Sequence, residues 1–452
     1  MKPFPAKNPR YTRRPTWVLR LLAAALTLAL LAAACGDSSG DDAATTTAAG
    51  QEAATTTAPT TTESPAATTT EPVTTQAPAA PTENLTRGCV EDYAEGVDYF
   101  PQKLSVDDAE RLDVTYADNY KVVEVSDANF EEAAFTYVLV QCGTPAPELS
   151  GDLAGATVVE VPIDSAVVMS TTMLPGLSEI DRLDVVKGLD SFDYVSTPAV
   201  LDLIDSGELV ATGSLSFGFD AEAMAAAEPD VAFTFLFGPA ADELAPLEGL
   251  DIPAAVSADY RENTPLGRAE WMKFPALFLN EEAAITELYE GIAADYDALV
   301  QTAAGADTRP TVLLDKATDG VWNVAGGDSY AATFISDAGG DYIFSDVPGN
   351  SGEQLDIETV LERASDADFW LNPGFGVTSL LDLEAADPRH GKFAAFERGD
   401  VWNNDLRVNA NFGNDYFETG AAHPELVLGD LVAILHPDLA PDHEFVFYRR
   451  LQ

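Results

Sequence analysis

This 452-residue chain has three cysteines, and the chemistry of a cysteine depends on the cell compartment that the protein occupies. Cys35 is the first of them. It follows the small residues Ala32–Ala34 and an apolar run from Trp17 that Arg20 alone interrupts with a charge. A basic start followed by an apolar run that ends in small residues predicts a cleaved signal peptide over residues 1–34. A cysteine directly after the cut predicts lipidation of its thiol. The alternative is an ordinary signal peptide with a chance cysteine.

The other two cysteines are Cys89 and Cys142. In an exported chain, thiols meet an oxidising environment, and a pair of them predicts one disulfide. The alternative is two free, buried thiols.

The positions of the histidines and the absence of catalytic motifs bear on whether the protein is an enzyme. All four histidines stand near the C-terminus, at positions 390, 423, 436 and 443. The sequence contains no Gly-x-Ser-x-Gly, Walker loop, His-Glu-x-x-His or Cys/His pair, and acidic residues are too frequent for any two of them to indicate a glycosidase. We therefore expect a protein that is not an enzyme, with no catalytic residue and no cofactor; a secreted hydrolase is the alternative.

Charge excludes one class of partner. The chain carries 24 Lys and Arg against 75 Asp and Glu, a formal net charge of −51, and six of the basic residues lie in the predicted signal. Such a chain is repelled by nucleic acid and by anionic membrane surfaces. Residues 35–83 are mostly Thr, Ala, Pro, Glu and Ser, which cannot bury a core, so they predict a disordered tether. The lipid is then the only expected contact with a membrane.

The elements that must position any site alternate between strands and helices. Apolar runs separated by helical patterns predict parallel α/β sheets that are covered on both faces. The expected strands of the first region are Lys121–Val125, Thr136–Gln141, Thr157–Val161, Ala166–Met169, Asp193–Val195, Leu209–Ala211, Val231–Phe235 and Ala254–Val256, with helices at Thr197–Ser206 and Ala221–Ala227. The alternation resumes at Thr311–Leu314, Tyr330–Ala338, Ile357–Ala364, Phe369–Leu371 and Val401–Trp402, and the chain closes on a helix, Pro424–Leu435.

One long helix is predicted between the two regions, over residues 280–305. Asn280 is a good N-cap and Gly305 a stop. Ile285, Leu288, Ile292, Tyr296, Leu299 and Ala303 recur at steps of three or four residues on one face. This gives an N-terminal lobe at 84–279, in which 84–150 forms an extension, and a C-terminal lobe at 306–452. An ordinary helix covering one domain is the alternative interpretation of the same pattern.

With this helix, the chain resembles the metal-chelate class of ABC-transporter substrate-binding proteins, which serve importers of iron-siderophores, haem or vitamin B12. The resemblance covers residues 155–440. It rests on Thr157–Pro162 with Ala166–Ser170, on Asp220–Val231, on Leu355–Asp366, and on His423–Leu431. In the second and third of these segments a glutamate stands seven residues before Pro229-Asp230 and Ser365-Asp366; Ser365 departs from the proline of the family pattern.

The resemblance implies two α/β lobes joined by a single backbone helix, with the ligand cleft between them. It also implies that Glu222 and Glu358, one on each lobe, dock onto arginines of an ABC permease dimer. Both could instead stand in first helical turns only because acids favour the helix dipole there.

Ligand contacts are expected at the carboxyl ends of the strands, where open α/β sheets leave a crevice. The candidates are Ser170, Thr171, Thr172, Phe237, Trp322, Asn323, Tyr330, Asn372, Trp402 and Arg407, with Arg268 and Trp271 as further ones. Aromatic rings suit a flat or greasy chelate, and amides and a guanidinium suit its polar groups. Each of them could equally be a core or turn residue.

A bare transition metal fits the sequence poorly, because a cleft site would need His and carboxylate from both lobes and the first lobe has no histidine. We expect no metal site of the protein's own. The expected ligand is a small-molecule metal chelate that arrives preformed, a ferric siderophore before haem or cobalamin. The protein is expected to be a lipid-anchored, extracytoplasmic monomer; a cell-surface adhesion lipoprotein is the remaining alternative.

Overall fold

The computed structural model describes residues 80–216 and 218–452. The predicted signal peptide, Cys35 and all but the last few residues of the predicted tether lie outside the described residues. Within the described part, no helix is long and apolar enough to cross a membrane.

The first lobe is built on a parallel five-stranded sheet in the order β7-β6-β5-β8-β9. Its strands are β5 (Ala166–Val168), β6 (Val186–Leu189), β7 (Val210–Ala211), β8 (Val231–Phe235) and β9 (Ala254–Ser257). Alternate residues of β5 enter different cores, Val168 the main core of the lobe and Val167 a smaller one with Met224 and Leu247. The sheet is therefore buried on both faces, as parallel sheets usually are.

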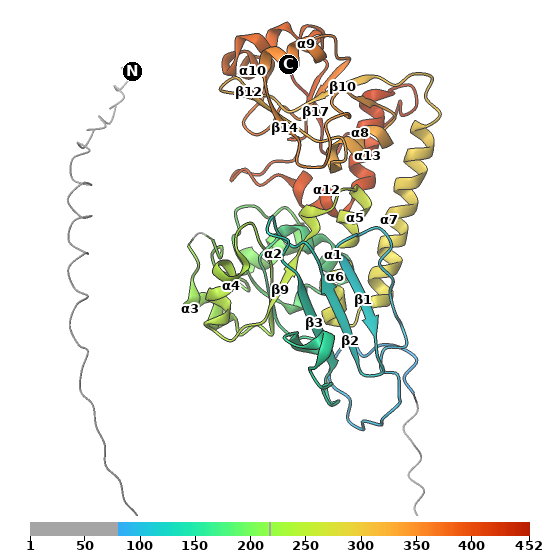
Figure 1. Ribbon diagram of the computed structural model, residues 1–452, viewed down its shortest axis with the longest axis vertical. Helices are drawn as coiled ribbons and strands as arrows, with labels where there is room; N and C mark the ends of the chain where they lie inside the picture. The colour runs from blue at the N-terminus through green and yellow to red at the C-terminus, as the bar shows by residue number, and fades with distance from the viewer. Residues whose placement is uncertain (1–79, 217) are drawn as a thin grey trace, which may run out of the picture. The chain divides into compact units, whose positions relative to one another are not determined.

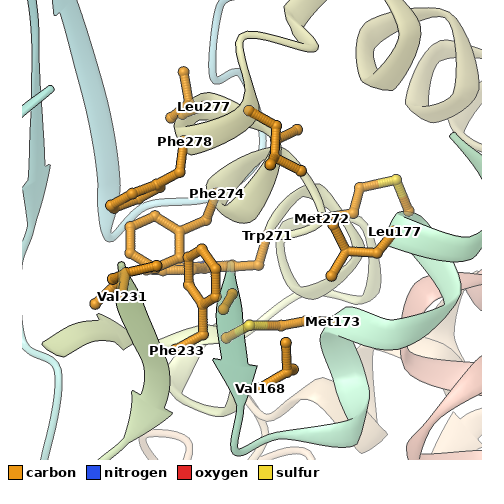
Figure 2. Packing of buried hydrophobic residues seen from close by; sticks show 14 of the residues in the cluster. Val168, Met173, Leu177, Val231, Phe233, Trp271, Met272, Phe274, Leu277 and Phe278 are labelled. Carbon is orange, nitrogen blue, oxygen red and sulfur yellow. The ribbon is translucent and has the colours of Figure 1, made fainter. Parts of the chain in front are cut away.

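Aromatic side chains fill the main core of this lobe. Phe233 of β8 packs against Phe274 and Phe278, with ring centroids 6.1 and 5.1 Å away (Figure 2). The helices of the lobe are α1 (Leu174–Glu179), α2 (Pro198–Ser206), α3 (Ala221–Ala227), α4 (Ala240–Glu248), α5 (Pro265–Glu270) and α6 (Lys273–Leu279).

Residues before 155 add a second sheet to the same lobe. Strands β1 (Leu112–Tyr116), β2 (Tyr120–Val125) and β3 (Phe135–Gln141) are antiparallel, and β4 (Thr157–Val161) joins β3 in parallel. Tyr137 of β3 enters the main core, and its hydroxyl accepts a hydrogen bond of 2.8 Å from the backbone N–H of Val256. The predicted disulfide is present: Cys89 is bonded to Cys142, just beyond β3.

Helix α7 (Glu282–Ala303) connects the lobes as one continuous rod (Figure 1). Ile285, Tyr289 and Ile292 belong to the core of the first lobe, whereas Tyr296 and Ala303 belong to that of the second. The predicted start was wrong, because Asn280 is not the N-cap of this helix. It ends α6 at φ 57°, and its side chain is used in a buried hydrogen-bond network instead.

The second lobe has a five-stranded sheet in the order β13-β10-β15-β16-β17, parallel except for β17. Its strands are β10 (Thr311–Leu314), β13 (Asp341–Tyr342), β15 (Phe369–Leu371), β16 (Val401–Asn403) and β17 (Arg449–Arg450). A small antiparallel sheet joins β11 (Ala317–Thr318), β12 (Val321–Val324) and β14 (Glu353–Asp356). The helices are α8 (Tyr330–Asp337), α9 (Ile357–Ala364), α10 (Leu380–Ala386), α11 (Ala394–Arg398), α12 (Thr419–Ala422) and α13 (Pro424–Leu435).

Two sequence expectations fail in this fold. Asp193–Val195 is not a strand; the carbonyls of Asp193 and Val195 accept hydrogen bonds from the side chain of Asn409 instead. The strand of this region is β6, whose apolar pattern is interrupted by Lys187 and by Gly188, which lies directly against Val210. The chain also does not close on α13, because its end returns to add the edge strand β17.

Candidate functional site

A cavity of about 720 Å³ lies between the two lobes. Its first-lobe wall includes Thr171 and Tyr194, and Arg268 of α5 reaches it from the segment that precedes α7. Its second-lobe wall comes from the loops after β10, β15 and β16, from α8 and from residues 408–417. A concave space of this size between two α/β lobes can hold a drug-sized organic ligand.

The second-lobe wall is polar because three neighbouring parallel strands end there. Asp315 follows β10, Asn372 follows β15, and Asp405 lies two residues beyond β16. Asp315 and Asn372 both have a positive φ, 62° and 52°. Non-glycine residues in the left-handed region are uncommon and often mark functional positions.

Arg268 stands at the centre of the interlobe region, because it lines this cavity and also a smaller one of about 280 Å³ beside it. Its guanidinium carbon lies 3.9 Å from the centroid of the Tyr330 ring. The same guanidinium donates to the backbone carbonyl of Tyr260 at 3.0 Å. Stacking and this hydrogen bond hold the cation in place without neutralising it.

Four aromatic rings are largely exposed around the cavity. Tyr194, Phe375, Phe412 and Phe417 are 55%, 75%, 63% and 60% exposed, and all four line it. Phe375 and Phe412 meet edge to face at 5.3 Å. Exposed rings gathered around one cavity indicate a surface that a ligand covers.

Burial changes the acidity of two groups in the wall. Burial raises the pKa of Asp315 to about 6, against the charge of the neighbouring Lys316, which lowers it. Burial also raises the pKa of Tyr416 well above its usual value, and the neighbouring Tyr330 and Tyr448 add to this shift. Tyr416 therefore stays a neutral hydroxyl at physiological pH.

A strap from the second lobe, residues 404–422, rests on the first lobe next to the cavity. The buried carboxylate of Glu418 accepts from the backbone N–H groups of Ser196 and Thr197, at 2.8 and 2.6 Å. These are backbone N–H groups at the start of α2, where a carboxylate is favoured. Gly413 passes so close to Tyr194 that a Cβ there would lie 2.7 Å from the Tyr194 Cα, which explains the glycine.

Three of the ten predicted ligand residues line the cavity: Thr171, Tyr330 and Asn372. Ser170 and Thr172, on either side of Thr171, do not, although their hydroxyls lie 2.9 Å apart. Of the further candidates, Arg268 lines the cavity, whereas Trp271 is buried in the first core with its indole N–H on Glu262 at 3.1 Å.

The other predicted ligand residues lie elsewhere. Trp322 is a correction: it is fully buried in the second core, and its indole N–H donates to the Leu314 carbonyl. Asn323 is exposed on β12, and Phe237 is an exposed ring of the first lobe outside this cavity. Trp402 packs against Phe445. Arg407 lines a neighbouring interlobe cavity of about 560 Å³ and is paired with Asp415 at 3.0 Å.

Sequence reasoning missed Tyr194, Asp315, Phe375, Phe412, Phe417 and Arg449. Only Asp315 had a usable signal, since it directly follows a predicted strand. The others lie in irregular loops or at the chain's far end, where periodicity carries no information.

The two predicted docking glutamates occupy helix starts on different lobes. Glu222 is exposed in the first turn of α3, which Asp220 caps, and Glu358 is exposed in the first turn of α9, which Asp356 caps. Glu358 also has a partner within the chain, because it forms an ion pair with Arg389.

The histidines belong to packing and to ion pairs. His390 is buried beside Trp322 and Trp370, and the ring of His423 contacts Glu179 and Glu425 at 2.7 and 2.9 Å. Within residues 80–216 and 218–452, no group of three His, Cys, Asp or Glu side chains is arranged to hold a metal ion.

The fold and the cavity define a class: a two-lobed binding protein with a single connecting helix and a ligand site between its lobes. Residues 201–401 match the family model described as periplasmic binding protein. This match agrees with the resemblance to the metal-chelate class of ABC-transporter substrate-binding proteins that the sequence motifs indicate.

Relatives match this chain over much of their length. An uncharacterized lipoprotein of Methanocaldococcus jannaschii is 27% identical over 314 residues, which are 67% of this chain and 72% of the relative. A second lipoprotein of that organism is 25% identical over 355 residues, 75% of this chain and 87% of the relative. Among solved structures, a periplasmic binding protein from Veillonella parvula is 14% identical with a TM-score of 0.48, covering 70% of this chain and 98% of that one.

Proposed function

We propose that this protein is a substrate-binding lipoprotein that captures a metal chelate between its lobes and delivers it to an ABC importer. The preferred ligand is a ferric siderophore, with haem and cobalamin as the other members of the class. The observation that carries the proposal is the interlobe cavity, which combines exposed aromatic rings with the guanidinium of Arg268.

The lining fits a preformed chelate better than a bare ion. A bare metal ion needs several donor side chains converging within bonding distance. In the described residues the cavity instead offers rings, amides and two arginines, over a volume of about 720 Å³. Rings contribute dispersion and hydrophobic contact over the body of an organic ligand, and the polar groups orient it.

Delivery to a permease is supported by the positions of Glu222 and Glu358. Each is exposed on the first turn of a helix, one on each lobe, where a partner that spans the two lobes could reach both carboxylates. Glu358 would exchange its ion pair with Arg389 for an arginine of the partner. A rigid connecting helix keeps the two lobes at a fixed spacing where it joins them. This helps the protein to present both glutamates to the permease at the same time. We place the lipid anchor on Cys35, whose acylation would keep the protein at the membrane surface.

The test is a titration of the purified soluble chain, beginning after Cys35, with ferric hydroxamate and catecholate siderophores, haem, cobalamin and free Fe³⁺. At least one chelate should bind with a Kd below about 10 µM and quench the intrinsic fluorescence, and free Fe³⁺ should not. Arg268→Gln should weaken binding of an anionic chelate about 10- to 100-fold, because a charge-assisted contact is lost.

Arg87→Gln is the matched control. Arg87 is an exposed arginine that pairs with Asp184 and does not line the cavity. The same change of charge there should leave affinity unchanged within about twofold, because distant surface charges are screened. Absence of binding by every chelate, or tighter binding of the free ion, would refute the proposal.

A further inference from the structure

Four charged side chains line the interlobe cavity: Arg268, Asp315, Asp405 and Arg449. Two of them neutralise each other, because Arg449 donates to Asp405 at 2.7 Å. Arg449 is held further by a hydrogen bond of 3.0 Å to the Thr378 carbonyl. The two charges cancel without a ligand, so the net charge of this pair contributes little to selection.

The remaining two charges, on Arg268 and Asp315, are opposite in sign, and neither forms an ion pair within salt-bridge distance among the described residues. Among the described residues, Arg268 has no carboxylate within salt-bridge distance, and its partners are the carbonyls of Glu262 and Tyr260 and the ring of Tyr330. The Asp315 carboxylate likewise has no hydrogen-bond or ion-pair partner in the described part of the chain. Only the backbone of Asp315 forms hydrogen bonds. Its N–H donates to the Leu371 carbonyl, and its carbonyl accepts from the indole N–H of Trp370.

Two more residues with acceptor atoms line the second-lobe wall with Asp315. Asn372 Oδ1 and Asp405 Oδ1 are both buried without a hydrogen-bond partner among the described residues. Both residues follow strands of the sheet that contains β10, and both line the same cavity as Asp315. A buried acceptor without a donor destabilises the folded protein, and native proteins keep few of them.

The polarity of the cavity is therefore divided. The side of α5 presents a fixed cation, and the ends of β10, β15 and β16 present three acceptors, among them the unpaired carboxylate of Asp315. A purely anionic ligand would satisfy Arg268 but would be repelled by Asp315 and would leave the acceptors unpaired. A purely cationic ligand would do the reverse.

We infer, resting on the proposed function, that the ligand of this cavity is dipolar. Its anionic group pairs with Arg268, and a protonated amine at its other end lies against Asp315, with Asn372 and Asp405 accepting its remaining N–H groups. An ammonium has three donors and no acceptor, which matches three acceptor groups that lack donors. Asp315 is then the residue that distinguishes this ligand from chelates that carry negative charge alone.

The experiment uses one linear ferric trihydroxamate with a terminal amine at one end and a terminal carboxylate at the other. Three derivatives complete the set: N-acetylated, methyl-esterified, and blocked at both ends. Binding of all four to the soluble chain is measured by calorimetry at pH 7.5. The unblocked chelate should bind tightest, and N-acetylation should weaken binding by at least about tenfold, as expected when one partner of a desolvated ion pair is removed.

Asp315→Asn tests the residue. This variant should bind the N-acetylated chelate as well as the unblocked one, so that the tenfold preference disappears. Glu384→Gln is the control, an exposed acid on α10 outside the cavity, and it should keep the preference. Because the comparison of ligands is made first on the unaltered protein, the test does not depend on folding of the variant.

The outcomes separate the two proposals. Equal binding of all four chelates would overturn the dipolar ligand while leaving the proposed function standing. Tightest binding of the N-acetylated or doubly blocked form would overturn it as well. No binding of any of the four also overturns it, and the wider set of chelates and free Fe³⁺ then decides the proposed function separately.

Discussion

Replacement of Lys121 by Met should destabilise the first lobe more than any surface change, because it leaves a carboxylate buried and unpaired. Lys121 and Glu282 are fully buried and form an ion pair at the start of α7. Lys121 also donates to Asn280 Oδ1 at 2.9 Å, and Asn84 donates to Glu282 Oε2 at 2.8 Å. Burial lowers the pKa of Lys121, and the charge of Glu282 opposes this, so the lysine depends on its partner.

The magnitude follows from what remains after the change. Glu282 would keep Asn84 and, at 3.4 Å, the hydroxyl of Tyr116, but no cation. Removal of one member of a buried ion pair typically costs about 3–5 kcal/mol. The double variant Lys121→Met/Glu282→Gln carries no buried charge, so it should recover part of this loss, giving a coupling energy of about 2 kcal/mol or more.

The assay is urea unfolding of the soluble chain, followed by both far-UV circular dichroism and tryptophan fluorescence. Lys103→Met is the matched control in the same segment, since Lys103 is about 40% exposed and forms an ion pair with Asp98. That exposed pair should contribute less than about 1 kcal/mol. A loss below about 1 kcal/mol for Lys121→Met, or a double variant no better than the single one, would refute the argument that Glu282 is a buried charge.

Three further predictions concern pH, docking and the anchor. Burial lowers the pKa of His423, but the hydrogen bonds and charges of its carboxylate partners outweigh this and raise the pKa to about 10. His423→Gln should therefore cost about 2–3 kcal/mol of unfolding free energy below pH 6.5, after allowance for the partly exposed Glu179. This cost should fade as pH rises through 10, which unfolding measured across that pH range will test. Reversal of both Glu222 and Glu358 to Lys should leave chelate affinity within about twofold yet sharply reduce uptake in vesicles reconstituted with the permease; unchanged uptake would return both residues to a helix-dipole role. Cys35→Ser should abolish incorporation of labelled fatty acid, and continued labelling would contradict the lipid anchor.

Local pattern was sufficient wherever an element is repetitive and buried. The strand Val231–Phe235 and the helices Ala221–Ala227, Ile357–Ala364 and Pro424–Leu435 have the limits expected from sequence. The long helix between the lobes was also predictable, because an apolar face that repeats over about six turns is typical of a continuous helix. Capping was less decisive: Asn280 has the chemistry of an N-cap, yet it adopts a left-handed backbone and its side chain binds a buried lysine.

For the site, too, some features could be predicted from the sequence and others could not. The sequence by itself determined that a cleft would exist, since two α/β regions joined by one helix leave a crevice at the ends of their strands. Tertiary structure alone decided which side chains face it. Trp322 and Tyr330 looked alike as aromatic candidates, but one lies on the core face of a small sheet and the other stacks under Arg268.

The charged residues of the cavity show most clearly why the sequence alone could not identify the site residues. With 75 acidic residues in the chain, nothing in the order of amino acids marks Asp315 as different from the rest. It becomes different because the fold pairs Asp405 with Arg449 and leaves Asp315 and Arg268 in the same cavity without an ion-pair partner among the described residues. Local sequence sets which backbone a residue prefers, whereas burial and pairing depend on residues that are distant in the chain, and only the folded lobes bring those together.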